Sequence, residues 1–383
     1  MNKRQRIVIA LSGGVDSSVA AFLLKNAGHD VIALFMRNWH DETLIKDTKC
    51  PWIEDSNDAL TVAQQLKIPF QIIDLSKEYK ERIVDYMIDE YKKGNTPNPD
   101  ILCNREIKFD VFLKYALKLN ADFIATGHYC KKKEKNGTYE LIQGKDKLKD
   151  QSYFLCQINQ KQLEKIIFPI GHLIKKEVRE IAQKNQLITA NKKDSQGLCF
   201  VGKIKLPVFL QQKIKNKKGD IIEISAESEL YQQKLKLGYE INYCEQDGVK
   251  IGEHNGAHYF TIGQRKGITI GGRQKPLFVI GTNIKNNILF VGMGKKHPGL
   301  FRMNLRIKAK NVHWINEKKK ILNNEKKELF IKIRHRQSLQ KGLLHMTPEH
   351  LYIIFKNPQR GISKGQFAAW YQEDELIGSG PID

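Results

Sequence analysis

The sequence predicts an α/β fold with an N-terminal doubly wound parallel sheet, then a small β-rich central domain and a C-terminal β-barrel. Apolar, strand-like runs alternate with helical runs in the first half, which is typical of a parallel sheet. After about residue 205, short apolar alternations separated by glycines replace the helical periods. A chain of 383 residues is also too long for one ordinary core. We therefore predict domains at residues 1–205, 206–295 and 296–383.

The elements of the first domain follow from residue patterns. Residues 6–11 are apolar and β-branched, which favours a buried strand, and residues 16–26 have a helical period with Gly28 as a plausible C-cap. The same criteria predict strands at residues 31–36, 70–75 and 122–126, and helices at 56–66, 76–93 and 101–119. Ligands bind at the carboxyl ends of such strands, where Ser12, Met36 and Gly127 are found.

The second half is predicted to be mainly strands. Patterns typical of strands occur at residues 258–262, 278–281, 288–292, 329–334, 350–355, 366–371 and 376–378. Turn residues such as Pro358 and Gly365 separate them. Residues 131–137 and 316–327 are charged and polar, so we expect loops there.

Charge and cysteine content restrict the class of protein. The net charge is +22, from 64 Lys and Arg against 42 Asp and Glu, which permits a polyanionic partner, although solubility alone would also explain it. The six cysteines are scattered and offer no CxxC pair, so neither a disulfide framework nor a zinc site is expected. No apolar run has the length of a membrane span or of a signal peptide. We expect a cytoplasmic protein without a membrane partner.

A glycine turn near the N-terminus predicts a phosphate site. Ser12-Gly13-Gly14-Val15-Asp16-Ser17-Ser18 joins a strand to a helix, where backbone amides bind anions. The lysine of a P-loop is absent from the turn. The turn resembles the SGGxDS loop of the ATP pyrophosphatase superfamily, which implies adenylation with release of pyrophosphate. The alternative is that Asp16 and Ser17 merely cap a helix.

A cysteine in residues 96–105 (TPNPDILCNR) is a candidate nucleophile. Two prolines lead into the helix predicted at 101–119, which would place Cys103 in its first turn. Unpaired amides there, with Arg105 and Lys108 nearby, favour the thiolate, and Asp100 could transfer a proton. Alternatively, Asp100 is an N-cap and Cys103 a buried small hydrophobe.

Cys199 is a second candidate, since residues 194–202 (DSQGLCFVG) form a polar segment that contains glycines. A reaction that needs two cysteines is sulfur transfer, in which one carries a persulfide, the other attacks it, and a disulfide results. The remaining cysteines, Cys50, Cys130, Cys156 and Cys244, lack comparable surroundings and are interpreted as structural.

Five motifs in order resemble the tRNA-specific 2-thiouridylase family over most of the chain. They are TPNPDILCNREIKF, TGHY, KDQSYFL, DSQGLCFVG and YFTIGQRKG. The resemblance implies an adenine nucleotide alpha hydrolase-like first domain. It also implies formation of 2-thiouridine at the wobble position of tRNAs for lysine, glutamate and glutamine. The uridine C2 oxygen would be adenylated, and sulfur would then displace AMP.

The resemblance also implies roles for individual residues. It implies ATP contacts by Ala10, Leu11, Ser12, Gly13, Gly14, Val15, Asp16, Ser17, Met36 and Gly127. It implies contacts to the target base by Asn98, Pro99 and Asp100, with Asp100 as acid or base. It implies tRNA contacts by His128, Lys149, Asp150, Gln151, Arg334, His335 and Gln366. Cys103 would be the nucleophile, and Cys199 the persulfide carrier that forms a transient disulfide with it.

The implied co-substrates are ATP with Mg²⁺ and a persulfide sulfur, with Asp16 as a candidate magnesium ligand. The implied partners are tRNA and a sulfur donor, either a cysteine desulfurase or a sulfur-relay protein. Arg334, His335 and Arg336 with Lys332 form the densest basic cluster of the second half, which either grips the tRNA backbone or is a solvated strand face.

The chain departs from the family pattern in three places. His335 replaces a tyrosine, Cys130 replaces an alanine, and residues 221–249 form an apparent insertion in the central domain. Two other interpretations remain. One is an ammonia-using ATP pyrophosphatase, GMP-synthetase-like or lysidine-synthetase-like, which shares the SGGVDS loop but needs no cysteine pair. The other is an RNA-binding protein without catalytic activity.

Overall fold

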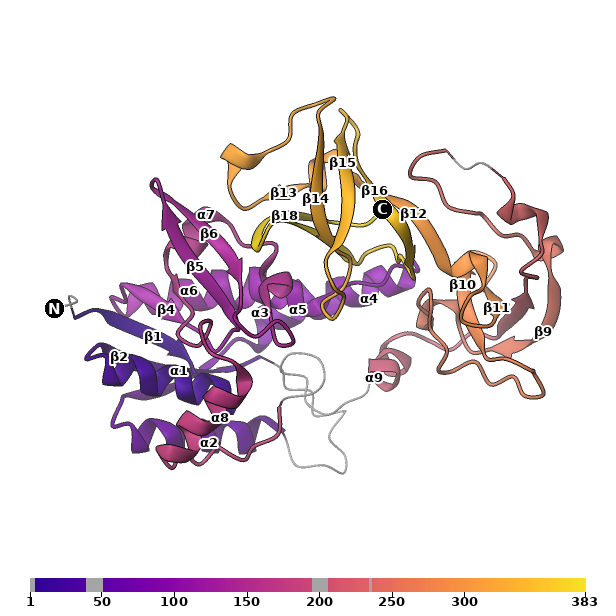
Figure 1. Ribbon diagram of the computed structural model, residues 1–383. Helices are drawn as coiled ribbons and strands as arrows, with labels where there is room; N and C mark the ends of the chain where they lie inside the picture. The colour runs from indigo at the N-terminus through magenta and orange to yellow at the C-terminus, as the bar shows by residue number, and fades with distance from the viewer. Residues whose placement is uncertain (1–3, 39–50, 195–205, 234–235) are drawn as a thin grey trace.

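The computed structural model describes residues 4–38, 51–194, 206–233 and 236–383, and it contains three sheets (Figure 1). The first has the order β3-β2-β1-β4-β7, and all of its neighbouring strands are parallel. Its strands are β1 (Arg6–Ala10), β2 (Asp30–Arg37), β3 (Phe70–Asp74), β4 (Phe123–Ala125) and β7 (Ile166–Ile167). The predicted parallel α/β fold is confirmed.

Helices cover both faces of this sheet because the side chains of β1 alternate between two cores. Ile7 and Ile9 pack in the core that includes residues of α1 (Val15–Asn26), α2 (Pro51–Gln65) and α8 (Lys175–Lys184). Val8 and Ala10 pack in the core that includes α4 (Asp85–Lys92), α6 (Phe112–Lys118) and α7 (Gln160–Glu164). The sheet is therefore doubly wound, as predicted.

Two long helices on the second face contain π-helical stretches. One runs from α3 (Ser76–Tyr79) through the stretch Lys80–Val84 into α4. The other runs from α5 (Pro99–Leu102) through the stretch Cys103–Val111 into α6. π-Helical segments are rare and often occur at functional sites. The second helix begins at Pro99, two residues before the predicted start.

The central sheet has the order β10-β11-β8-β9 and follows α9 (Leu206–Lys213). Its strands are β8 (Gly219–Glu223), β9 (Val249–His254), β10 (Leu277–Asn283) and β11 (Ile288–Met293). The strand predicted at 258–262 is wrong, because Ala257–Tyr259 forms a single 3₁₀ turn.

The connection from β8 to β9 lies within the predicted insertion and reaches the neighbouring domain. The amide of Gly238 donates to Asn304 Oδ1 at 2.8 Å, and Glu240 pairs with Arg302 at 2.9 Å. Asn304 and Arg302 both lie on β12 (Phe301–Lys308). The connection therefore joins the central domain to the first strand of the C-terminal domain.

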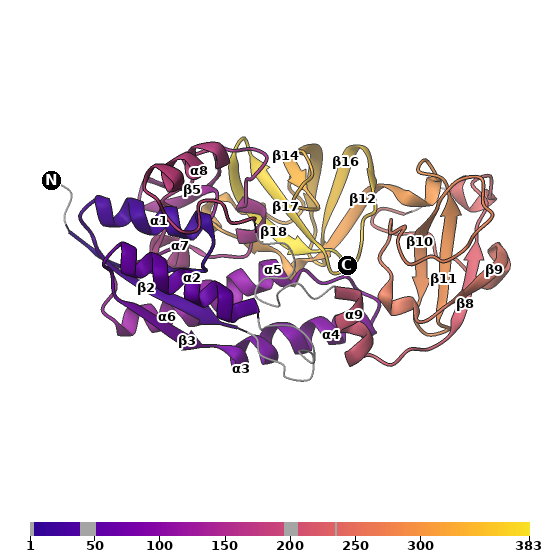
Figure 2. The same ribbon diagram turned by 90° about the horizontal axis from the view of Figure 1, so that it is seen from below.

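The C-terminal domain is a curled antiparallel sheet around its own apolar core. Its strands are β12 (Phe301–Lys308), β13 (His313–Trp314), β14 (Lys326–Lys332), β15 (Gln340–Met346), β16 (His350–Arg360), β17 (Phe367–Gln372) and β18 (Glu375–Pro381). Figures 1 and 2 both show this domain between the other two, so the order in space differs from the order along the chain. The exact domain boundaries stay a prediction.

A hairpin of the N-terminal domain joins this last sheet, and it corrects one prediction. β5 (Cys130–Lys135) and β6 (Thr138–Gln143) are antiparallel, and β6 pairs with β18. The loop predicted at 131–137 is therefore wrong. Asn136 and Gly137 have φ values of 50° and 68°, which suits a two-residue hairpin turn. The lysines of β5 keep an edge strand polar, a pattern easily mistaken for a loop.

No helix within the described residues has both the length and the apolar character needed to cross a membrane.

Candidate active site

The glycine turn after β1 is built around the start of α1. Gly13 has φ +72°, and a Cβ there would lie 2.1 Å from the carbonyl oxygen of Asp55, so a side chain would not fit. Ser17 Oγ lies 3.2 Å from the amide of Ser12 and 3.0 Å from the carbonyl oxygen of Gly14, which closes the turn. Gly14 is the N-cap of α1, and no side chain caps the helix. The alternative in which Asp16 and Ser17 serve only as caps is therefore wrong. Because no side chain caps the helix, backbone amides at the start of α1 stay available to bind an anion.

Met36 and Gly127 reach the same edge of the sheet, as predicted. Met36 is buried near the end of β2, and Gly127 follows β4. A Cβ on Gly127 would lie 2.7 Å from the amide nitrogen of Ser17. The end of β4 therefore approaches the glycine turn closely, as an adenosine site beside a phosphate site requires.

Lys175, at the start of α8, places a cation beside the glycine turn, which contains none of its own. Its Nζ lies 2.7 and 2.9 Å from the two carboxylate oxygens of Asp16 and 2.8 Å from Asp194 Oδ1. A lysine is unfavourable in the first turn of a helix, because the helix dipole is positive there. Lys176 occupies the same turn, so this position alone does not single out Lys175, and sequence reasoning missed it.

Asp194 is held by three cations. Lys149 contacts it at 2.6 Å and Arg179 at 3.0 Å, in addition to Lys175. Partial burial of Asp194 opposes ionisation, but the bonds from Lys149 and Lys175 outweigh it and lower its pKa to about 2. Through Lys175, this network connects Asp16 in the glycine turn to Asp194, the last residue that the structure describes before residue 206.

Asp16 does not fit the role of magnesium ligand in this arrangement. Lys175 pairs with both of its oxygens, and the hydroxyl of Tyr129 donates to Oδ1 at 2.7 Å. Across the described ranges, no group of three or more His, Cys, Asp or Glu side chains could hold a metal ion.

Asn98 starts the helix that carries Cys103. Its Oδ1 accepts a hydrogen bond from the amide of Ile101 at 3.2 Å, and Pro99 occupies the first helical position. The amide of Cys103 is bonded to the carbonyl oxygen of Pro99. The expected first-turn position of Cys103, with unpaired amides, is therefore wrong, because the helix begins earlier. Asp100 is not the N-cap either.

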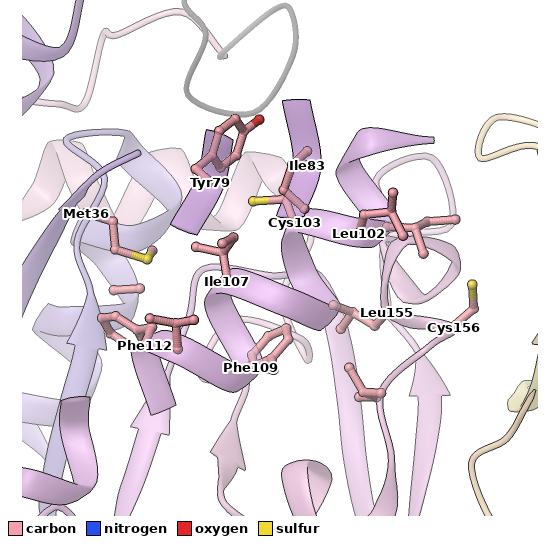
Figure 3. Close-up of a cluster of buried hydrophobic side chains, with 14 of the residues drawn as sticks. Met36, Tyr79, Ile83, Leu102, Cys103, Ile107, Phe109, Phe112, Leu155 and Cys156 are labelled. Carbon is pink, nitrogen blue, oxygen red and sulfur yellow. The ribbon is translucent and has the colours of Figure 1, made fainter. Parts of the chain in front are cut away.

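Cys103 is completely buried. Its exposure is 0%, and it packs in one apolar cluster with Met36, Tyr79 and Ile107 (Figure 3). Cys103 opens the π-helical stretch of this helix. Cys103 and Met36, at the carboxyl end of β2, thus belong to the same cluster, but a substrate reaches Cys103 only if the surrounding side chains move.

Two of the other described cysteines, Cys130 and Cys156, are fully buried in the same cluster as Cys103. Cys199 and Cys50 lie outside the described residues. Burial raises the pKa of Cys156 to about 12 and that of Cys130 well above its usual value. Cys244 is exposed, and none of the described cysteines is in a disulfide. Cys130 and Cys156 therefore behave as small apolar residues, as interpreted.

Several residues expected to contact tRNA are instead turned inward. Asp150 is 2% exposed and accepts hydrogen bonds from Gln143 Nε2 at 2.9 Å and the amide of Gly144 at 3.1 Å. His128 is also buried, and burial lowers its pKa, as does nearby Lys108. In this structure the Asp150 side chain is thus an internal contact, and its contact with tRNA stays a prediction. Contacts by Lys149 and Gln151 stay predictions.

The C-terminal residues of the predicted tRNA surface lie next to the N-terminal domain. His335 stacks on Phe154, with ring centroids 4.3 Å apart, and its Nε2 lies 2.8 Å from the carbonyl oxygen of Asp150. The guanidinium of Arg334 donates to the carbonyl oxygen of Arg360. Lys332, counted in the basic cluster, is 5% exposed. This cluster is therefore partly an internal contact rather than a solvated strand face.

The fold and the site together define an α/β nucleotide-binding protein with two appended β-rich domains. Family models match residues 5–203 ("tRNA methyl transferase HUP domain"), 238–293 ("tRNA methyl transferase PRC-barrel domain") and 304–382 ("Aminomethyltransferase beta-barrel domain"). The chain is 54% identical to the tRNA-specific 2-thiouridylase MnmA of Christiangramia forsetii, covering 99% of this chain and 100% of that protein.

Similar matches come from other organisms. The 2-thiouridylase of Karelsulcia muelleri is 55% identical over 99% of both chains. That of Halalkalibacterium halodurans is 43% identical, over 100% of this chain and 95% of the relative. The chain belongs to the tRNA-specific 2-thiouridylase family, which confirms the resemblance drawn from its motifs.

Proposed function

We propose that the protein is a tRNA-uridine 2-sulfurtransferase that forms 2-thiouridine at the wobble position of tRNAs for lysine, glutamate and glutamine. The observation that carries the proposal is that Cys103 lies on the helix that begins after Asn98 and packs in the same apolar cluster as Met36, at the carboxyl end of β2. An ammonia-using ligase needs no thiol at this position. The conditions of the cytoplasm, which keep thiols reduced, suit such an enzyme.

ATP would activate the C2 oxygen of the uridine, so that sulfur can replace it. Amides of the glycine turn and the ammonium of Lys175 would hold its phosphates, and Met36 and Gly127 would face the adenosine. Magnesium would arrive as the counter-ion of the ATP substrate. The uridine C2 oxygen would attack the α-phosphorus and release diphosphate. Asn98, Pro99 and Asp100 would hold the base during this step, with Asp100 moving the proton.

Sulfur then replaces the activated oxygen. A sulfur-donor protein would load Cys199 as a persulfide. The Cys103 thiolate would attack the Cys199 sulfur and form a Cys103–Cys199 disulfide, releasing hydrosulfide that adds to C2 as AMP leaves. A thiol reductant would restore both cysteines. Because Cys103 is buried, the proposal requires that tRNA binding exposes it.

The test is nucleoside mass spectrometry of tRNA incubated with the protein, ATP, Mg²⁺ and a persulfide source. The wild-type chain should produce 2-thiouridine at the wobble position, and Cys103→Ser and Cys199→Ser should not. Cys156→Ser is the matched control, since Cys156 is equally buried and its pKa is raised. Full thiolation by both Cys103→Ser and Cys199→Ser would overturn the proposal, as would tRNA binding without ATP cleavage.

A further inference from the structure

The two residues that lead into the substrate-base segment are held from both downstream domains. Thr96 and Pro97 immediately precede Asn98, the N-cap of the Cys103 helix. Pro97 is buried, whereas Asn98 and Asp100 are partly exposed. The position of this short peptide therefore sets where the helix begins and where Asn98 and Asp100 are presented.

The central domain contacts the peptide through a hydroxyl pair. Thr261 Oγ1 lies 3.0 Å from Thr96 Oγ1, although the residues are 165 positions apart in the sequence. Thr261 lies in a loop that is fixed to β10, because the amide of Gly263 donates to the carbonyl oxygen of Val279 at 2.7 Å. The hydroxyl of Thr261 is thus presented from a well-anchored backbone.

The C-terminal domain contacts the same peptide from another direction. Gln366 Nε2 donates to the carbonyl oxygens of Thr96 at 3.0 Å and of Pro97 at 3.3 Å. The amide of Thr96 donates to the carbonyl oxygen of Lys364 at 2.7 Å. Gly365 has φ +84°, and a Cβ there would lie 3.1 Å from the amide nitrogen of Thr96, so the close approach favours glycine.

Asn98 has a further connection to the C-terminal domain. Its side chain interacts with the hydroxyl of Tyr153, which is fully buried, and opposes the rise in the pKa of this phenol that burial causes. The hydroxyl of Tyr153 donates to the carbonyl oxygen of Phe367 on β17 at 2.9 Å. The residues from Thr96 to Asn98 therefore make polar contacts with both β-rich domains.

We infer that Thr261 and Gln366 are positioning residues that fix the Asn98–Asp100 segment for the target uridine, so that docking of all three domains completes the site. The inference rests on the proposed function. It gives Gln366 an internal role in place of the tRNA contact expected from the sequence. The reacting atoms must be placed to within about 1 Å, and a misplacement of that size lowers the reaction rate by up to about a hundredfold. Loss of one of these contacts should therefore slow the reaction more than it weakens tRNA binding.

The test is a double-mutant cycle on the two threonines. Thr261→Val and Thr96→Val each remove one hydroxyl while keeping the β-branched shape. Each should lower the single-turnover rate of 2-thiouridine formation by about fivefold to tenfold, as expected for one lost hydrogen bond, while the tRNA dissociation constant changes less than about twofold. The double variant should be no slower than either single one, because the same contact is lost.

Two further variants separate positioning from general damage. Thr261→Ser keeps the hydroxyl and should restore the rate, and Thr282→Val on β10 of the same domain should leave the rate unchanged.

The role of Gln366 is tested separately. Gln366→Glu should slow the reaction without weakening tRNA binding, because a carboxylate would face two carbonyl oxygens.

Four outcomes would overturn parts of this scheme. Absence of thiolation by the wild-type chain overturns the proposed function itself. If the wild-type chain is active, additive effects of the two threonine variants or an unchanged Thr261→Val rate overturns the positioning role of Thr261. Weaker tRNA binding by Gln366→Glu at an unchanged rate overturns that of Gln366 and restores the tRNA contact.

Discussion

Lys332 on β14 and Asp150 of the N-terminal domain form an ion pair inside the protein, with Nζ and Oδ2 3.1 Å apart. Their side chains are 7% and 1% exposed. Asp150 also accepts a hydrogen bond from Ser152 Oγ at 3.0 Å, and Ser152 Oγ lies 3.2 Å from the hydroxyl of Tyr371 on β17. A buried charge pair thus forms part of the contact between the N-terminal domain and the barrel.

Breaking this pair should destabilise the protein strongly. Lys332→Met leaves the Asp150 carboxylate buried without its cation and should reduce the free energy of unfolding by about 3–5 kcal/mol. Urea unfolding measures the change. Adding Asp150→Asn should recover part of the loss, because the remaining buried charge is removed. A loss of stability below about 1 kcal/mol in Lys332→Met would show that the pair contributes little.

Lys175 should be needed for ATP rather than for folding. Lys175→Met removes the cation beside the glycine turn and should raise the ATP dissociation constant by roughly tenfold to a hundredfold, as for a lost charge-assisted hydrogen bond. Isothermal titration calorimetry measures this dissociation constant. Lys176→Met is the matched control on the same helix, because Lys176 is 82% exposed and pairs only weakly, at 3.9 Å, with Glu180. Equal ATP affinity of the two variants would contradict the assignment.

A single methyl group on Gly127 should displace the glycine turn. The added Cβ would lie 2.7 Å from the amide nitrogen of Ser17 and 2.8 Å from the carbonyl carbon of Asp16, so the backbone must shift. Gly127→Ala should slow ATP cleavage by about a hundredfold, since placement of the reacting groups is lost. AMP formation in the presence of tRNA is the measurement. Gly271→Ala, which has no atom within 4 Å of the added Cβ, should behave as the wild-type chain does.

The stability of the β5–β6 hairpin should depend on pH above neutrality. Burial lowers the pKa of the Lys132 ammonium to about 8, whereas an unfolded lysine titrates near about 10.4. Between these values the unfolded chain binds more protons, so the free energy of unfolding should rise with pH through this window.

Comparison with Lys132→Met isolates this contribution. Urea unfolding at several pH values from 7.5 to 10 should show a steeper rise for the wild-type chain than for the variant. Parallel curves would mean that Lys132 keeps an ordinary pKa in the folded protein. In the structure its Nζ donates to the carbonyl oxygen of Glu164 at 2.9 Å and lies 5.0 Å from the centre of the Tyr139 ring.

The local patterns of the chain were sufficient for the first sheet and the glycine turn. The strand, the turn and the helix follow one another within a few residues. The turn therefore lies at the carboxyl end of β1 whatever the rest of the chain does. The edge hairpin β5–β6 was missed because its partner, β18, comes more than 200 residues later. Pairing with such a distant strand leaves no periodic signal in the charged residues 131–137.

The residues of the candidate site likewise fall into those that the sequence predicted and those that only the structure revealed. The sequence by itself determined the glycine turn, the Asn98–Cys103 segment and the family, because each is a contiguous run whose chemistry depends on neighbouring residues. Only the tertiary structure showed that Lys175 pairs with Asp16 of the glycine turn, that Asp150 and Lys332 are buried, and that Thr261 and Gln366 contact Thr96 and Pro97. Such contacts join residues far apart in the chain, and burial depends on which domains pack together, which no local pattern encodes.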